Sequence, residues 1–508
     1  MLPEKPCPSA AAGHKMNRMS KAEVIERLLA RPDLRRLFRW MTDNGPSGGP
    51  GDRGGRSRLA RFFKAYADGT ASWWRPEFAV PYLVTEVFRR AAGASRETLR
   101  TRVFGNPATR RGLVATVRSV GHLGLSKPQQ FVAPFMVVWN FTQACNLRCK
   151  HCYQEAGRRA DDELTLEEQK QIVDILADHD VAMLALSGGE PLMSPTLLEV
   201  ARYASDRDIH VTVATNGTLL TPEKVEAIAR AGIRYAEISL DSVDPARHDA
   251  FRGGKGYWEA AVRGIRNVVR HGGMRCGVAM TVTRWNLDEL QDMLEWCIAE
   301  GVSTFYAFNF IPTGRALGAT DQDLSPEERE RMLAILQKYL VGGRISIMCT
   351  APQYGRACLE FGGPDSPVNT GHYGYGGGRA TRVLAKYVGG CGAGRCYMAL
   401  QPNGDVTPCV FLPIKVGNLR TDPFQTIWNH PVMRLVRDRE ARTGHCKVCE
   451  YRYHCGGCLA RSHGYFGDLR RADPGCKFNL AEWQEVLASA APAPAGTVPL
   501  IRERGPSL

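Results

Sequence analysis

The stretch FMVVWNFTQACNLRCKHC, residues 135–152, joins an apolar run to a short segment with three cysteines. The run 135–141 has the length and the aliphatic and aromatic content of a buried strand. Cys145, Cys149 and Cys152 follow it in what we expect to be one loop. Three thiolates in one loop can bind three irons of a four-iron cluster and leave the fourth iron open. A zinc site with His151 as the fourth ligand is the alternative that this segment leaves open.

Apolar runs and helical patterns alternate after this loop. Five further runs predict strands, at 182–187, 210–215, 235–240, 277–283 and 303–310. Helical periodicity lies between them, at 165–179, 195–207, from 222 onward, 257–271 and 287–299, and again at 325–340. The alternation predicts an α/β fold, in which six strand–helix units form a parallel sheet curled into a partial, TIM-like barrel. Ligands of such folds bind at the carboxyl ends of the strands.

Several predicted strands end in residues that suit a small-molecule site. Ser187-Gly188-Gly189-Glu190-Pro191 ends the second strand, where glycines allow close backbone approach and the carboxylate could meet an ammonium group. Hydroxyl, amide and carboxylate groups follow the third and fourth strands, at Thr215, Asn216, Ser239, Asp241 and Ser242. Each of these motifs alone is also compatible with an ordinary turn at the end of a strand.

Eight more cysteines lie in tight spacings near the end of the chain. They are Cys391, Cys396, Cys409, Cys446, Cys449, Cys455, Cys458 and Cys476. Two sets of four could ligate two complete four-iron clusters, and two zinc sites are the alternative. The segment around them has little apolar periodicity, so we expect bound metal to hold it together.

The order of the first motifs resembles the radical SAM superfamily: C-x3-C-x2-C after a first strand, then Gly-Gly-Glu after the second. The resemblance implies that the open iron binds S-adenosylmethionine and that reduction yields a 5′-deoxyadenosyl radical, which abstracts a substrate hydrogen. An electron donor such as flavodoxin or ferredoxin would be a partner. His151 matches an aromatic position near the adenine, or it only shields the cluster. The cofactor-binding residues that the resemblance implies are Gly188, Gly189, Glu190, Thr215, Asn216, Ser239, Asp241 and Pro312.

The later cysteines resemble the SPASM extension of one branch of this superfamily. In that pattern the ligands of two auxiliary clusters interleave along the chain. Carried over, Cys391, Cys396, Cys409 and Cys458 would bind one cluster, and Cys446, Cys449, Cys455 and Cys476 the other. Three 4Fe–4S clusters are therefore expected, with the two auxiliary ones in electron transfer. Only two residues separate Cys455 from Cys458, where three are more common, which leaves the pairing open. A non-enzymatic electron carrier is a further alternative, disfavoured by the open iron.

Short segments resemble SPASM enzymes that act on tetrapyrroles on routes to haem, among them 248–254, 311–315, 351–353 and 410–413. The Gln-Met-Asp motif of sulfatase maturases is absent. We expect a tetrapyrrole or another cofactor precursor as the substrate, with a peptide substrate as the alternative. No residue is assigned to the substrate radical. Four arginines could hold substrate carboxylates or make structural ion pairs: Arg252, Arg315, Arg344 and Arg356.

The net charge of +14 comes from the first part of the chain, because residues 1–130 hold 24 Lys/Arg and 10 Asp/Glu. Such a basic segment could meet nucleic acid, an acidic partner protein, a membrane surface or an anionic substrate, or simply be a solvated helical face; of these partners we do not expect nucleic acid. The expected division is a mostly helical extension (1–130), the barrel (131–345), a linker with a glycine-rich loop (346–390), the SPASM domain (391–480) and a disordered tail (481–508). No transmembrane or signal segment is recognised, so we expect a cytoplasmic protein.

Overall fold

The computed structural model describes residues 26–43, 57–363, 365–370, 373–374 and 379–490, apart from residues 28 and 92. Most of the expected disordered tail therefore lies outside the described residues. Its first part is helical, since α20 spans Leu480–Ala490. Among the described helices, none combines the length and the apolar character that a bilayer-crossing segment requires.

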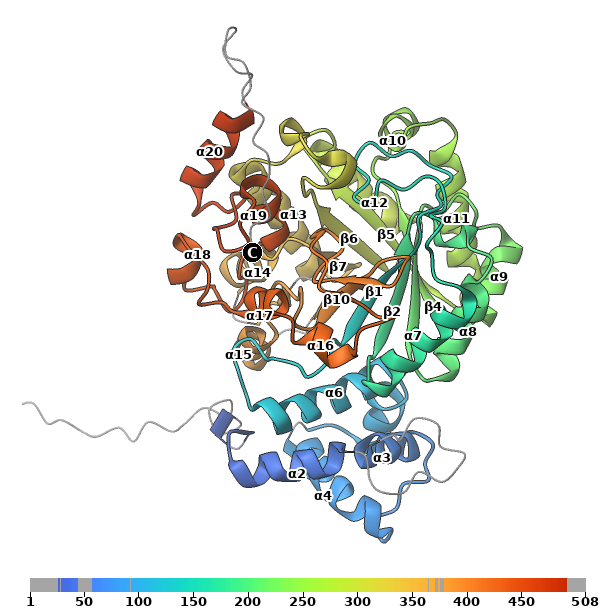
Figure 1. Cartoon of the computed structure of the whole chain (residues 1–508), viewed down its shortest axis with the longest axis vertical. Coiled ribbons are helices and arrows are strands. Elements are labelled where there is room, and N and C mark those ends of the chain that lie inside the picture. Colours follow the sequence, from blue (N-terminus) through green and yellow to red (C-terminus); the bar gives the residue numbers. More distant parts are fainter. Residues whose placement is uncertain are drawn as a thin grey trace, which may run out of the picture.

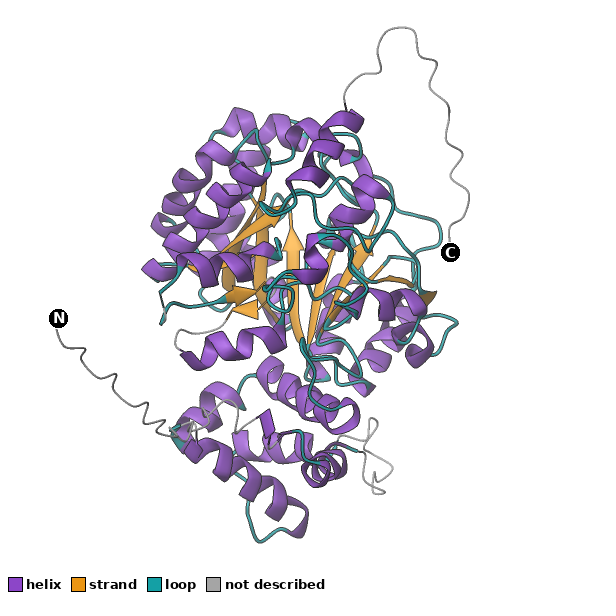
Figure 2. Ribbon diagram, turned by 90° about the vertical axis from the view of Figure 1, so that its left-hand side faces the viewer, coloured by secondary structure: helices purple, strands orange, loops and turns teal. Residues whose placement is uncertain are grey.

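A curved sheet of ten strands forms the body of the molecule (Figures 1 and 2). Seven of its strands are parallel and lie side by side in chain order. They are β1 (Met136–Thr142), β2 (Met183–Gly188), β3 (His210–Thr215), β4 (Ile233–Ser239), β5 (Arg275–Val282), β6 (Thr304–Asn309) and β7 (Ser346–Cys349). The helices between them are α7 (Leu166–Asp178), α8 (Leu197–Asp206), α9 (Pro222–Arg230), α10 (Pro245–Arg252), α11 (Tyr257–His271), α12 (Leu290–Ala299) and α13 (Pro326–Gly342). The predicted α/β partial barrel is confirmed.

The side chains of β4 show why the sheet has two different faces. Ala236 and Ile238 are fully buried in the main apolar core. The alternate residues Tyr235, Glu237 and Ser239 line a cavity on the inner face. This alternation follows from the two-residue period of a strand, and it divides the barrel into a dry outer layer and a hollow inner one.

The segment 346–390, expected as a linker, contributes regular structure to the sheet. It contains β7, α14 (Gln353–Phe361), the short strands β8 (Asn369–Thr370) and β9 (Tyr373–Gly374), and α15 (Arg379–Val388). β7 pairs in parallel with β6. The sequence did not predict this strand because only four residues form it, which is too short a run for periodicity to reveal.

The cysteine-rich region continues the sheet at the other edge. β10 (Tyr397–Leu400) pairs in parallel with β1, and β11 (Asp405–Thr407) and β12 (Gly417–Asn418) follow as antiparallel strands. Short helices then carry the remaining cysteines: α16 (Phe424–Trp428), α17 (Pro431–Arg437), α18 (His445–Val448) and α19 (Leu459–Phe466). The barrel and the cysteine-rich region therefore share one sheet.

The N-terminal part is a helical unit beneath the amino ends of the strands (Figure 1). Its elements are α2 (Pro32–Thr42), α3 (Arg58–Ala67), α4 (Pro76–Ala91), α5 (Arg96–Thr98), a π-helical turn (Leu99–Val103) and α6 (Pro107–Leu123). An aromatic core of its own includes Phe62, Phe63 and Phe104. α6 joins the unit to the barrel, because the buried Arg110 contacts the carboxylate of Asp208 at 2.5 Å.

Candidate functional site

A cavity of about 1230 Å³ lies inside the barrel. Ser187 and Ser239 line it at the carboxyl ends of their strands, and His210 and Arg275 line it at the amino ends. The cavity therefore extends along the whole length of the barrel. Typical small-molecule sites have volumes of about 300–1,000 Å³. This one has room for a cofactor and a substantial substrate together.

The three predicted cluster ligands Cys145, Cys149 and Cys152 all line the cavity at its carboxyl end. Arg315 shapes their loop: its backbone N–H donates to the Cys152 carbonyl at 3.0 Å and its Nε to the Cys149 carbonyl at 2.8 Å. Burial raises the pKa of the Cys145 thiol to about 11. The free thiol is therefore protonated at neutral pH, and a bound metal would displace its proton. Three cysteines in one loop that can be deprotonated in this way suit an iron–sulfur cluster.

The Gly-Gly-Glu segment packs directly against this cysteine loop. A Cβ on Gly189 would lie 2.2 Å from the Ala144 carbonyl oxygen, so only glycine fits. The carboxylate of Glu190 is fully buried and accepts hydrogen bonds from Thr215 Oγ1 and from the Asn216 N–H, each at 2.8 Å. Burial raises the pKa of Glu190 to about 7. Glu190 thus ties the end of β2 to the end of β3.

The structure places the predicted cofactor-binding residues in two layers at this end of the barrel. Five of them line the cavity: Gly188, Gly189, Thr215, Asn216 and Ser239. Glu190, Asp241 and Pro312 do not belong to the lining. Asp241 is fully buried, where it accepts from the Thr281 N–H at 2.9 Å and from Arg252 Nε at 2.6 Å. The carboxylates of Glu190 and Asp241 lie outside the cavity, behind its lining, and their hydrogen bonds hold neighbouring segments of the chain in place.

His151 lies within the cysteine loop, directly before Cys152, and also lines the cavity. Its ring stacks on Phe251 with centroids 4.0 Å apart, and Phe251 stacks in turn on Trp285 at 4.9 Å. Burial lowers the pKa of His151 well below its ordinary value, so the imidazole is neutral. A neutral aromatic stack of this kind suits either the adenine-packing or the shielding role expected of His151.

All four arginines considered for substrate carboxylates are engaged within the protein. Arg315 donates to backbone carbonyls, and Arg252 pairs with Asp241 and donates to Cys149 Sγ at 3.7 Å. The other two make ion pairs, Arg344 with Glu295 and Arg356 with Glu330 and Glu360. Arg252, Arg344 and Arg356 thus make structural ion pairs, whereas Arg315 bonds only to backbone carbonyls; Arg252 and Arg315 also line the cavity.

Three other arginines, not singled out from the sequence, line the opposite end of the cavity. They are Arg102 of the π-helical turn, Arg234 of β4 and Arg275 of β5. Arg234 donates to the Ala229 carbonyl and Arg275 to Thr304 Oγ1, each at 3.2 Å. In the part of the chain that the structure describes, none of the three pairs with a carboxylate. This end of the cavity is therefore positively charged and suits an anionic ligand.

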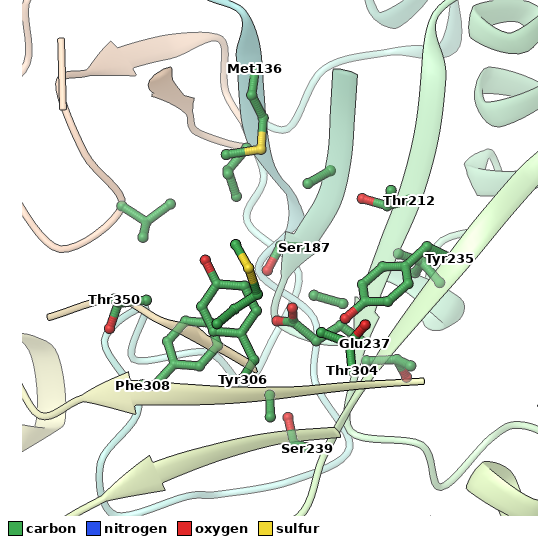
Figure 3. Close-up of a pocket in the computed structure, with 18 of the residues that line it drawn as sticks. Met136, Ser187, Thr212, Tyr235, Glu237, Ser239, Thr304, Tyr306, Phe308 and Thr350 are labelled. Atoms are coloured by element: carbon green, nitrogen blue, oxygen red, sulfur yellow. The ribbon is translucent and has the colours of Figure 1, made fainter. Parts of the chain in front are cut away.

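Glu237 points into the cavity between these two ends (Figure 3). Within the described residues, no hydrogen bond or ion pair holds its carboxyl group. Burial alone raises the pKa of Glu237 to about 7, so neutral and ionised forms coexist near neutral pH. The sequence contained a signal for this residue: a carboxylate in an apolar strand, two residues before Ser239 and thus on the same face.

The structure divides the eight downstream cysteines between two places. Cys391, Cys409 and Cys458 line the main cavity, and Cys396 is buried beside Gly392, another lining residue. The other four surround a second, small cavity: Cys446, Cys449, Cys455 and Cys476. N–H and O–H groups already point at the sulfurs, as when Tyr397 Oη donates to Cys409 Sγ at 3.4 Å.

Two buried arginines lie between these two cysteine groups. Arg439 is close to Cys391 and Cys455, and Arg442 is close to Cys391 and Cys446. In both guanidinium groups, Nε and Nη1 have no hydrogen-bond partner among the described residues. Burial lowers the pKa of Arg439 to about 10. Buried cations need a counter-charge, and anionic iron–sulfur clusters at the two cysteine groups would supply it, so the residues fit such clusters.

Comparison with known proteins agrees with this geometry. Residues 139–297 match the model of the radical SAM superfamily, and residues 391–450 match the SPASM model of an iron–sulfur cluster-binding domain. The AdoMet-dependent heme synthase of Methanosarcina barkeri is 35% identical over 348 residues, which are 68% of this chain and 96% of that protein. The chain belongs to the radical SAM superfamily. It is a radical SAM enzyme, a class that uses S-adenosylmethionine and a 4Fe–4S cluster, and it carries a SPASM region.

A second relative and a solved structure are also similar to this chain. The mycofactocin maturase of Mycolicibacterium smegmatis is 31% identical over 351 residues, 68% of this chain and 83% of that protein. The crystal structure of Streptococcus suis SuiB bound to S-adenosylmethionine has a TM-score of 0.55 at 17% identity, and the match covers 73% of this chain and 82% of SuiB. The SuiB comparison supports the fold alone.

Proposed function

We propose that this radical SAM enzyme modifies a tetrapyrrole that carries several carboxylate side chains. The observation that carries the proposal is the cavity, which reaches from the cysteine loop to an end lined by Arg102, Arg234 and Arg275. Guanidinium groups without a protein carboxylate can bind substrate carboxylates in bidentate fashion. The similarity to a heme synthase, 35% identical along almost its full length, supports the same substrate class.

The cofactor ligands that we propose lie at the carboxyl end of the barrel. Cys145, Cys149 and Cys152 would hold the catalytic cluster, and the two lining glycines with Thr215, Asn216 and Ser239 would bind S-adenosylmethionine, supported from behind by Glu190, Asp241 and Pro312. When bound, the cluster and S-adenosylmethionine supply a 5′-deoxyadenosyl radical that removes a substrate hydrogen. The chain's own contribution is to hold these residues around the carboxyl end of the cavity.

Glu237 would contact the substrate between the cofactor end and the arginine end. In its protonated form it can donate a hydrogen bond to a carboxylate of the substrate. The ionised form would repel the same carboxylate across a cavity of low polarity. We therefore assign Glu237 the role of a proton-carrying binding residue, whose effect weakens as the pH rises through its pKa of about 7.

We propose two auxiliary 4Fe–4S clusters with the interleaved ligand sets expected from the resemblance. The grouping of the cysteines around separate cavities supports this assignment, and so do the unpartnered guanidinium groups between them. With four cysteines each, both clusters would carry electrons rather than bind substrate. A flavodoxin or ferredoxin would supply electrons to the catalytic cluster.

The test is turnover with a panel of porphyrins. The enzyme is reconstituted anaerobically, reduced, and offered S-adenosylmethionine with di-, tetra- and octacarboxylic porphyrins, with and without iron. We expect one of the porphyrins to stimulate the release of 5′-deoxyadenosine. The mass of that porphyrin should change in proportion to the 5′-deoxyadenosine released. Both effects should vanish in Cys149→Ala. No mass change with any porphyrin would overturn the proposal.

A peptide substrate is the second candidate. It is favoured by the maturase relative, which matches the same share of this chain as the heme synthase at a slightly lower identity. A short precursor peptide encoded beside the enzyme, modified in place of every porphyrin, would favour this candidate.

A further inference from the structure

Helix α4 of the N-terminal unit is apolar on two sides: its inner side packs Phe78, Tyr82 and Val84 into the aromatic core, and its outer side also exposes apolar side chains. Its inner side carries the buried Thr85 and Glu86, and Glu86 pairs with Arg89 at 2.9 Å and with Arg96 at 3.1 Å. Its outer side carries Leu83 and Val87, one helical turn apart, which are 65% and 58% exposed. A surface helix normally turns its apolar stripe inward, so the outer stripe of α4 is available for a partner.

Two exposed tryptophans precede the helix in the chain. Trp73 and Trp74 lie in the turn before α4, with exposed fractions of 62% and 73%, and their rings are 6.0 Å apart. Phe88, next to Val87, is also exposed. We call these five side chains the α4 outer face: Trp73, Trp74, Leu83, Val87 and Phe88. Figure 1 shows α4 at the edge of the molecule farthest from the cysteine-rich region.

Arginines flank the α4 outer face, and the first turn of the helix also carries the exposed Glu77. Arg75 and Arg90 are exposed at the two ends of the helix, and no carboxylate in the described residues pairs with either. The first 130 residues hold 24 Lys/Arg and 10 Asp/Glu, whereas the chain as a whole holds 66 and 52. The surface therefore combines indole rings, aliphatic side chains and excess cations, which is the composition of a segment that lies on an anionic membrane.

We propose that the α4 outer face binds the surface of an anionic lipid bilayer. Trp73 and Trp74 would occupy the headgroup region, where amphipathic indole rings are most favourable, and Leu83 and Val87 would reach the acyl boundary. Arg75 and Arg90 would contact lipid phosphates. Pairing with a second copy is disfavoured, because a symmetric contact through this face brings the same arginines of both copies together. Both family matches begin after residue 138, so this surface lies outside the shared catalytic region.

Co-sedimentation with vesicles tests the proposal on the full-length holoenzyme. The probes are vesicles of phosphatidylcholine alone and vesicles of phosphatidylcholine and phosphatidylglycerol in a two-to-one ratio. We expect binding to the anionic vesicles only, and weaker binding at high salt, because exposed charges are screened. Leu83→Ser, and separately the pair Trp73→Ala and Trp74→Ala, should each lower the partition coefficient about tenfold or more.

The matched control is Leu317→Ser, which removes an equally exposed leucine from another part of the chain. It should bind vesicles like the unmodified protein, and the variants on α4 should keep the melting temperature and the cleavage of S-adenosylmethionine. Arg90→Glu should weaken binding to anionic vesicles without changing the fold. The absence of vesicle binding, or equal binding by Leu83→Ser and Leu317→Ser, would overturn the proposal. So would a dimer in light scattering that Leu83→Ser dissociates, because the face would then join two copies.

Discussion

Glu237 is one residue whose environment makes the stability of the barrel depend on pH. Burial raises the pKa of its carboxyl to about 7 from an ordinary value of 4.5, so the folded protein binds a proton that the unfolded chain releases. Stability then decreases as the pH rises from about 4.5 to about 7, and the full cost is present above that range. A salt-bridged carboxylate has the opposite effect, because its lowered pKa makes stability increase as the pH rises.

Glu237→Gln should therefore stabilise the protein above neutral pH. The expected gain is on the order of 3 kcal/mol at high pH and falls toward zero as the pH decreases, since Gln has no charge to bury. Thermal unfolding of the anaerobic holoenzyme between about pH 6 and pH 8.5 measures it. Glu295→Gln, at an exposed position, is the control. A difference independent of pH would contradict this account.

Replacement of Gly189 should impair binding of the catalytic cluster. Its Cβ would lie 2.2 Å from the Ala144 carbonyl oxygen, so Gly189→Ala must displace the loop that carries Cys145. We expect loss of most of the catalytic cluster and a destabilisation of about 2–3 kcal/mol. Iron and sulfide content and the melting temperature are the measurements. Gly342→Ala, where no atom lies within 4 Å of the added Cβ, should change neither.

At the scale of elements, the two groups of cysteines are joined by the buried cations Arg439 and Arg442. A cation close to a cluster favours the reduced form, which carries one more negative charge. Because these guanidinium nitrogens have no hydrogen-bond partner among the described residues, we expect replacement of either arginine to change the reduction potential of a nearby cluster as well as folding.

Arg439→Gln should shift the midpoint potential of an auxiliary cluster to a more negative value. The expected shift is on the order of 60 mV, a tenfold change for a one-electron couple. Potentiometry followed by electron paramagnetic resonance measures it, in a Cys145→Ala, Cys149→Ala, Cys152→Ala background that lacks the catalytic cluster. Arg434→Gln, at an exposed position of α17, is the control. An unchanged potential would mean that Arg439 has only a packing role.

Elements were predictable from the sequence to different degrees, for identifiable physical reasons. β1 to β6 are buried runs with clear helical patterns between them, so local periodicity was enough. β7 is too short for that signal, and its place depends on pairing with β6. The positions of Glu190 and Asp241 behind the cavity depend on partners distant in sequence, Thr215 and Thr281. The arginines of the amino end come from three separate elements, so only the folded chain brings them together.

At the scale of the whole molecule, the proposed cofactor site and the proposed substrate-binding arginines lie at opposite ends of one cavity. Replacement of arginines at the second end should impair substrate binding without affecting the first. This separation makes the proposed function testable by kinetics, because the two ends contribute to different steps.

The double variant Arg234→Gln, Arg275→Gln should raise the KM for a porphyrin tetracarboxylate about tenfold or more, since charge-assisted hydrogen bonds contribute about 1.5–3 kcal/mol each. Binding of S-adenosylmethionine in the absence of porphyrin should stay unchanged. Arg344→Gln, which removes an exposed ion pair, serves as the control. A fall in kcat with an unchanged KM would place these arginines outside substrate binding.

The pairing of β10 with β1 has a consequence for the folding of the chain during its synthesis on the ribosome. Met136 pairs with Tyr397, so the first strand of the barrel must wait for most of the chain before its outer edge is covered. An uncovered parallel edge is prone to pair with other chains, and contacts so distant in sequence form slowly. We expect the nascent barrel to depend on chaperones until β10 arrives. Since β10 lies between Cys396 and Cys409, delivery of iron and sulfide could also determine when that edge closes.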